Sequence, residues 1–207
     1  MMPAMELRGP QITLRLPDPG DASALFALAR DPEVTRWFSW GPYASVEEPQ
    51  RWIAEQEAKR EAGEQLDFVI HHREHGPVGI TGLAELSRRD RRAMVGTWLG
   101  RDQWGTGANA ESKALVAHLA FAVCGLERLG AYSNPDNARS TRALERVGFT
   151  HEGTLRGWHR HGALQLDVHV FGLLRTDWPA SPLHDVPVTA IGTPPAPWLP
   201  GEPAPTF

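Results

Sequence analysis

Polar and apolar residues alternate along several short stretches of the chain, a pattern typical of half-buried β-strands. Three of these stretches follow one another, separated by a Gly76-Pro77 turn and by the arginine-rich run 88–92. Because such short connections join neighbouring strands, we expect an antiparallel meander there. A loop over residues 157–163 is expected to join the last two strands. Strands are predicted at residues 11–16, 66–71, 78–86, 93–99, 128–133, 149–156 and 164–175.

Other stretches repeat their apolar residues every three to four positions, as amphipathic helices do. Asp21 is placed to cap the first of these helices, and Gly63 and Gly125 are placed to end later ones in the left-handed conformation. Helices are predicted at residues 21–29, 45–63, 109–124 and 138–147, with a short one after Asp31-Pro32.

The composition is that of one globular domain, because 41% of the 207 residues are hydrophobic and 22% are charged. A net charge of −4 argues against broad binding to nucleic acid or to an anionic membrane. The start of the chain has no signal-peptide pattern, and no apolar run reaches the length of a membrane span. The single cysteine, Cys124, excludes an internal disulfide. We therefore expect a soluble, cytoplasmic protein.

Prolines become frequent after Trp178, and proline disfavours helices and interior strands. Residues 10–178 are therefore predicted to form one domain, and residues 179–207 an extended C-terminal tail. Trp198 gives this tail an apolar group that can pack on its own domain or on a partner subunit. The sequence leaves both alternatives open, and with them a homodimer.

Residues 96–111 lead from a predicted strand through a glycine-rich turn into a predicted helix. The backbone N–H groups of residues 105–109 would be free at such a helix start, and the helix dipole attracts an anion there. The turn is therefore predicted to cradle a phosphate group.

Such a turn can bind three kinds of phosphate ligand. A dinucleotide is disfavoured although residues 105–110 match G-x-G-x-x-A, because no acidic residue ends the next strand near Ser133. A nucleoside triphosphate is disfavoured because no lysine follows Gly105 or Gly107. A coenzyme whose pyrophosphate serves only as an anchor remains.

Further motifs follow the meander in a fixed order. They are the turn at 104–111, Asn137-Ala-Arg-Ser140, Gly148-Phe149, Glu152-Gly-Thr-Leu-Arg156, Gly162 and Asp167. As an ordered set they resemble the GCN5-related N-acetyltransferase (GNAT) family, and within it the RimJ/RimL-type branch that acetylates the N-termini of ribosomal proteins. The resemblance covers about residues 10–178. It implies an α+β fold with a mixed central sheet and a splayed cleft.

The resemblance also implies that acetyl-coenzyme A is the co-substrate. Its pyrophosphate would take the N–H groups of the turn, and its pantetheine arm would lie beside the strand at residues 96–100. A strand N–H at Trp98 or Leu99 is expected to polarise the thioester carbonyl. The implied coenzyme-binding residues are Trp98, Leu99, Gly100, Trp104, Gly105, Thr106, Gly107, Ala108, Asn109, Asn137 and Ser140.

Acetyl transfer needs an acid for the leaving thiolate and a base for the amine. Many members of the superfamily use a tyrosine as the acid, but Leu144 stands at that position, so Ser140 is the implied acid unless it only caps a helix. The branch tends to place acidic residues where this chain has Met94 and His159. His159 and Glu85 are therefore the candidate bases, and each has the alternative of an ordinary surface or pocket residue.

The predicted function is transfer of an acetyl group from acetyl-coenzyme A to a primary amine. A protein N-terminus is the first candidate acceptor, and a small amine, an amino acid or an antibiotic is the next. No metal is expected, because the histidines at 71–75 and 159–161 lack an HExxH helix or cysteine partners. A module that binds an acyl-coenzyme A or a dinucleotide without catalysis is the rival, and Met94 favours it.

Overall fold

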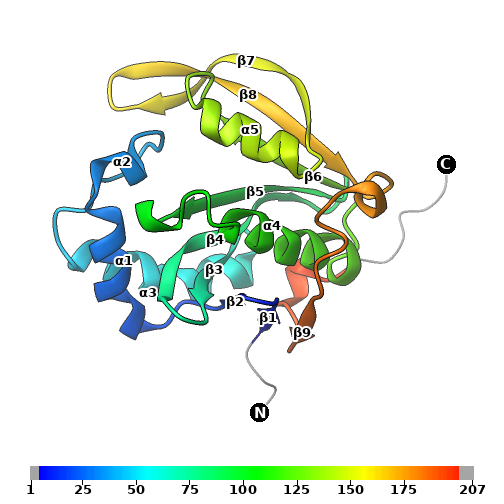
Figure 1. Ribbon diagram of the computed structural model, residues 1–207, viewed down its shortest axis with the longest axis horizontal. Helices are drawn as coiled ribbons and strands as arrows, with labels where there is room; N and C mark the ends of the chain where they lie inside the picture. The colour runs from blue at the N-terminus through cyan, green and yellow to red at the C-terminus, as the bar shows by residue number, and fades with distance from the viewer. Residues whose placement is uncertain (1–4, 201–207) are drawn as a thin grey trace.

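The computed structural model describes residues 5–200, which form a nine-stranded sheet with helices on both faces (Figure 1). The strand order is β7-β8-β6-β5-β4-β3-β2-β1-β9. Neighbouring strands are antiparallel except β5 and β6, which run parallel, so the sheet is mixed as predicted. The strands are β1 Glu6–Arg8, β2 Ile12–Arg15, β3 Gln65–His72, β4 Gly76–Ser87, β5 Arg92–Leu99, β6 Arg128–Ser133, β7 Thr150–His161, β8 Leu164–Leu174 and β9 Thr189–Ile191.

The helices agree closely with the apolar periodicity of the sequence. They are α1 Ala22–Ala29, α2 Pro32–Thr35, α3 Glu47–Ala62, α4 Ala108–His118 and α5 Ala138–Arg146. The end of the helix predicted at 109–124 is a π-helical turn, Leu119–Val123. Within residues 5–200, no helix has both the length and the apolar character needed to span a membrane.

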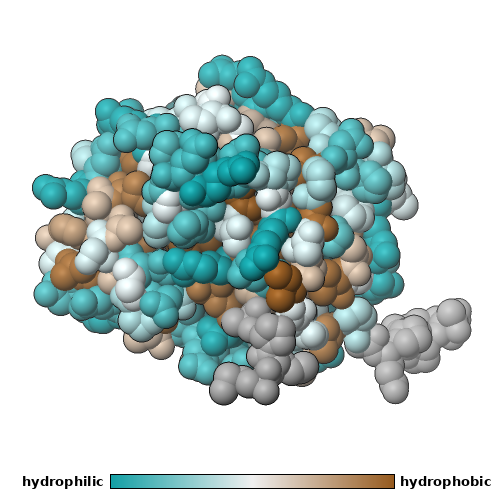
Figure 2. Space-filling model, turned by 60° about the horizontal axis from the view of Figure 1, so that its bottom comes forward, coloured by the Kyte–Doolittle hydropathy of each residue, from teal (hydrophilic) through white to brown (hydrophobic). Residues whose placement is uncertain are grey.

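Two cores lie on opposite faces of the sheet. On β3, Phe68 packs into the larger core with Leu115 of α4, whereas the next residue, Val69, packs into the smaller core with Leu25 of α1 and Ile53 of α3. Successive side chains of a strand point to opposite faces, so a strand that is covered on both sides is apolar throughout. The face shown in Figure 2 is mainly hydrophilic, with scattered hydrophobic residues.

The strands β5 and β6 diverge after a short paired segment. They pair only over residues 92–94 of β5 and 128–130 of β6. Figure 1 shows β6, β8 and β7 turning away from β5 and carrying α5 with them. The far half of β5 therefore has no neighbouring strand on this side, and the predicted splayed sheet is confirmed.

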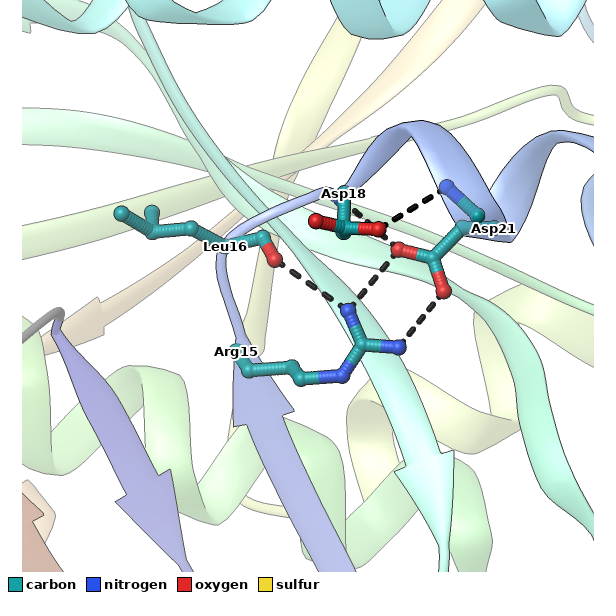
Figure 3. Close-up of polar contacts among 5 residues, drawn as sticks. Arg15, Leu16, Asp18 and Asp21 are labelled. Atoms are coloured by element: carbon teal, nitrogen blue, oxygen red, sulfur yellow. Dashed lines mark hydrogen bonds and ion pairs between the residues drawn. The ribbon is translucent and has the colours of Figure 1, made fainter.

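Polar contacts close the turn that precedes α1 (Figure 3). Asp18 accepts a hydrogen bond from the N–H of Gly20 (2.9 Å), and Asp21 accepts from the N–H of Asp18 and from Arg15 Nη1 (both 2.8 Å). Asp21 stands at the N-cap position of α1, as predicted, but its side chain makes no capping hydrogen bond to that helix. Its carboxylate is only 3% exposed, and pairing with the Arg15 guanidinium compensates that burial.

The prediction of a loop at residues 157–163 was wrong. The strand β7 continues to His161 and β8 begins at Leu164, so only a two-residue turn joins them. Gly162 in this turn has φ +59°, which favours glycine. The register shifts between Leu155 and His159, and this bulge interrupts the alternation by which a strand is predicted.

Residues 179–200 pack on the domain that precedes them. The strand β9 pairs with β1 at the sheet edge; neither strand was predicted, since three residues are too few to show alternation. Trp198 is 1% exposed, and its Nε1 donates to the carbonyl of Arg60 (2.9 Å). Residues 201–207 of the predicted tail lie outside the described part of the chain, and the domain boundary at residue 178 stays a prediction.

Candidate active site

A cavity of about 820 Å³ lies where β5 and β6 diverge. Its walls come from these two strands, the start of α4, α5, the segment 34–40 and the hairpin of β7 and β8. Ligand pockets typically measure about 300 to 1,000 Å³, so this cavity is large enough for a ligand of coenzyme size.

The side chains of β5 connect the cavity to both faces of the sheet. Thr97 contacts Lys113 of α4, with 3.3 Å between Oγ1 and Nζ. The next residue, Trp98, packs against the smaller core on the opposite face and lies near Trp40, with ring centroids 5.7 Å apart. The cavity is therefore a passage between the two faces and not a pocket on one of them.

The backbone of β5 offers free polar groups to the cavity. The N–H of Gly100 donates to the carbonyl of Val78 on β4 (2.9 Å). In an antiparallel pair, only alternate residues direct their backbone groups at the neighbouring strand. The backbone groups of Thr97 and the N–H of Leu99 therefore point away from β4, beyond the segment that pairs with β6, and toward the cavity, where an extended ligand can bond them as an added strand would.

The glycine turn has the geometry of an anion cradle. Gly105 and Gly107 have φ values of +81° and +99°, and the space where a Cβ would stand is open at both. Within residues 5–200, the N–H groups of Gly105, Thr106, Gly107 and Asn109 have no protein acceptor. Four free donors at the N-terminus of α4 suit a phosphate group.

Trp104 joins this turn to both walls of the cavity. Its Nε1 donates to the carbonyl of Leu99 (2.9 Å), and the guanidinium of Arg139 lies over its ring, 3.3 Å from the centroid. At the start of α5, Asn137 Oδ1 accepts from the N–H of Ser140 (3.1 Å), so Asn137 is the cap of this helix. The Ser140 hydroxyl has no protein partner among residues 5–200, which leaves it available to a ligand.

Glu85, Tyr132 and His159 form a cluster on the cavity wall. Tyr132 Oη donates to Glu85 Oε2 (3.3 Å), and the rings of Tyr132 and His159 are 5.3 Å apart. Glu85 sits in a bulge of β4 with φ +52°, which directs its side chain out of the regular ladder. Burial raises the pKa of Tyr132, and the Glu85 carboxylate adds to this effect. Burial and then His161 lower the pKa of His159, so its imidazole is neutral at pH 7.

Apolar side chains surround this polar cluster. Phe38 stacks on Trp40 with ring centroids 5.4 Å apart, and Trp40 contacts Trp98. Met94 packs against Gly130 where β5 and β6 part, so the position at which an acidic residue was implied is apolar. Trp37, Phe38 and Trp40 line the cavity.

Most of the predicted site residues meet in this cavity. Those that line it are Glu85, Trp98, Leu99, Trp104, Gly105, Gly107, Asn109, Asn137, Ser140 and His159.

Three predicted coenzyme-binding residues, Gly100, Thr106 and Ala108, are not among the residues that line the cavity. Gly100 packs against Leu28, and Ala108 is buried. The Thr106 hydroxyl stabilises the turn by donating to the Gln103 carbonyl (3.0 Å). Their roles in coenzyme binding stay predictions.

Three residues of the wall were missed by sequence reasoning: Tyr132, Arg139 and Lys113. A signal existed for Lys113, because it interrupts an apolar helical stretch four residues after Asn109. For Tyr132 there was none, since only the pairing of distant strands brings it to Glu85. In the part of the chain that the structure describes, no group of three or more His, Cys, Asp or Glu side chains is arranged to hold a metal ion.

Comparison with known proteins identifies the family. Residues 11–150 match the model of the acetyltransferase (GNAT) domain. The uncharacterized N-acetyltransferase p20 of Bacillus licheniformis is 29% identical over 169 residues, which cover 81% of this chain and 95% of p20. The structure of Mycobacterium smegmatis RimJ in complex with CoA-disulfide shares 23% identity with a TM-score of 0.78, over 89% of this chain and 95% of RimJ. The Microcin C7 self immunity acetyltransferase MccE, in complex with acetyl-CoA and AMP, shares 19% identity with a TM-score of 0.72, over 80% of this chain and 93% of MccE.

The domain match covers more than half of the chain, so the protein belongs to the GNAT acetyltransferases. It is an acetyl-CoA-dependent N-acetyltransferase. The family resemblance found in its motifs is thereby confirmed, and the likeness to RimJ is one of fold.

Proposed function

We propose that this acetyltransferase acetylates the N-terminal amine of a protein or peptide, with Glu85 as the general base. The layout of the cavity carries the proposal. The glycine turn follows Leu99, the last residue of β5. Glu85 lies near the opposite end of β5, because the residue before it, Ala84, pairs with Met94. Five residues of a strand span roughly 17 Å, a separation that suits a ligand with a phosphate group at one end and a reactive group at the other.

The coenzyme would be held by groups that the chain already offers. The four free N–H groups of the turn suit the pyrophosphate, and the free backbone groups of Thr97 and the N–H of Leu99 suit the amides of the pantetheine arm. Bound acetyl-coenzyme A supplies the acetyl thioester. Because the backbone of Trp98 faces β4, the N–H of Val95 adjoins the segment paired with β6 and Leu99 lies beside the turn, we assign polarisation of the thioester carbonyl to the N–H of Thr97.

The remaining groups suit the proton transfers. An α-amino group has a pKa of about 8 and is mostly protonated at pH 7, so it must lose a proton before it reacts. Glu85 is the one carboxylate on the cavity wall within the described residues, and Tyr132 orients it. Glu85 accepts this proton, directly or through one water. The free Ser140 hydroxyl donates a proton to the departing thiolate.

The proposed function is tested by mixing the protein with acetyl-coenzyme A and a panel of acceptors, and following thiol release. The panel contains peptides with free and with blocked N-termini, and small primary amines and amino acids. We expect turnover with free N-termini only. Turnover with small amines alone would replace the proposed acceptor, and coenzyme binding without turnover on any acceptor would favour the non-catalytic module.

Replacing Ser140 by alanine is expected to lower kcat about 100-fold, because the thiolate then leaves without its proton donor. The Ser140→Thr variant keeps a hydroxyl and should retain most of the activity. Steady-state kinetics with a good acceptor measure both variants. An alanine variant with unchanged kcat would remove Ser140 from the mechanism and leave Asn137 as the functional residue of this helix start.

A further inference from the structure

Lys113 of α4 is buried on the wall of the cavity without a negative partner. It is 8% exposed, and its Nζ donates to Asn109 Oδ1 (2.7 Å) and to Thr97 Oγ1 (3.3 Å). Both acceptors are neutral. Within residues 5–200, no carboxylate oxygen lies within 4.0 Å of this ammonium group, so it has no counter-ion in the protein.

The charged groups on the elements around Lys113 are engaged elsewhere or are themselves positive. Glu111 of α4 accepts from the backbone N–H groups of Gln11 and Ile12 (both 2.7 Å), and Glu85 of β4 pairs with Tyr132. Arg15 of β2 pairs with Asp21, and Arg92 of β5 with Asp90. The charged side chains that the facing helix, α5, brings to the cavity wall are all basic: Arg139, Arg142 and Arg146.

An ammonium group in this position is costly for the free protein. Burial of an unpaired charge is unfavourable, and burial lowers the pKa of Lys113 to about 8. The positive end of the α4 dipole adds to this cost, because Lys113 lies in the second turn of the helix. Lys113 lies close to the glycine turn, because its Nζ bonds Asn109, the second residue of α4. An anion bound at the turn would therefore offset both the cost of burying the charge and the repulsion by the helix dipole.

We propose that Lys113 couples coenzyme binding to the uptake of a proton. The phosphates of the coenzyme are the counter-charge that the ammonium group lacks, so the neutral amine of Lys113 takes a proton from solvent as the coenzyme binds. One N–H bond forms, no other bond changes, and the solvent supplies the proton. This inference rests on the coenzyme site of the proposed function and adds a pH dependence to it.

The direction of the effect follows from linkage. Below pH 8, Lys113 is charged both in the free protein and in the complex, and affinity is highest. Above pH 8 the free protein is neutral at this site, whereas the complex keeps its proton because the anion raises the pKa of Lys113. Affinity therefore falls as pH rises, by tenfold in total for each unit by which binding raises that pKa.

Isothermal titration with acetyl-coenzyme A alone, at pH 8.5 in two buffers of different ionisation enthalpy, measures the protons taken up. Acetyl-coenzyme A has no free thiol, and its phosphates are fully ionised at this pH, so the ligand itself does not titrate. We expect the wild-type protein to take up about half a proton or more. The Kd should rise about tenfold between pH 7 and pH 10.

Two variants separate Lys113 from other causes. Lys113→Met should take up no proton at pH 8.5, and its Kd should stay level with pH. Lys59→Met, at the surface lysine of α3, should behave as the wild type. Binding by the wild-type protein without proton uptake would overturn the role of Lys113 whether or not Lys113→Met folds, and would leave the proposed function intact. Failure of the wild-type protein to bind acetyl-coenzyme A would instead overturn the coenzyme site itself.

Discussion

Replacing Glu85 by glutamine is expected to lower kcat/KM about 100-fold to 1,000-fold at pH 7, the largest catalytic effect in the cavity. Glutamine preserves the size of the side chain and can still bond Tyr132, but it cannot accept the proton of the acceptor amine. The loss should shrink as pH rises from 7 to 9, because an amine with a pKa of about 8 then deprotonates without help. Initial rates of thiol release across this range measure both effects.

His159 provides the decisive comparison for this variant. Its lowered pKa keeps the imidazole neutral at pH 7, so it too is able to accept a proton. We expect His159→Asn to cost no more than about tenfold, as a neighbour of Tyr132 that shapes the cluster. A large loss in His159→Asn, together with near-normal rates in Glu85→Gln, would transfer the role of base to the histidine. Glu61→Gln, on the exposed surface of α3, serves as the control for the chemical change alone.

Replacing Trp198 by alanine should lower the free energy of unfolding by about 3 to 5 kcal/mol, the cost typical of removing a buried tryptophan. The indole is 1% exposed, and it bonds the carbonyl of Arg60 at the end of α3. Trp198 also packs into the larger core, so its side chain ties residues 179–200 to the domain. Urea unfolding followed by circular dichroism measures the loss.

Trp158 is the matched control for that experiment, because it is 52% exposed on β7. Trp158→Ala should change the free energy of unfolding by less than about 0.5 kcal/mol. If both tryptophan variants are equally stable, the packing of residues 179–200 contributes nothing to the domain.

Prediction from sequence worked best where the chemistry is local. Gly105 and Gly107 precede the apolar helix α4 by three residues and by one, so a single short segment of sequence is enough to predict the phosphate cradle. The same holds for Asn137 and Ser140, which are three residues apart at one helix start. The central strands were equally clear, because burial on both faces makes them apolar along their whole length.

Prediction failed where a neighbour far away in the chain decides the conformation. The outer half of β7 is a strand only because β8 pairs with it across a bulge, and β9 exists only beside β1. For a similar reason, Asp21 stands at the start of α1, but its side chain pairs with Arg15 of β2 and does not bond the helix. In each case the local pattern was weak, and hydrogen bonds or charge pairing to another segment determined the outcome.

The sequence by itself determined the family, the order of the strands and helices that carry the motifs, and the glycine turn that begins α4, since these depend on short-range patterns. Only the tertiary structure decided which side chains share the cavity. Glu85, Tyr132 and His159 come from β4, β6 and β7, and they meet because β6 leaves β5 after three paired residues. Only the tertiary structure, likewise, shows that the ammonium group of Lys113 is buried without a counter-charge. Its missing counter-charge is a property of the packed interior, where every nearby carboxylate within residues 5–200 is bonded elsewhere or too far away.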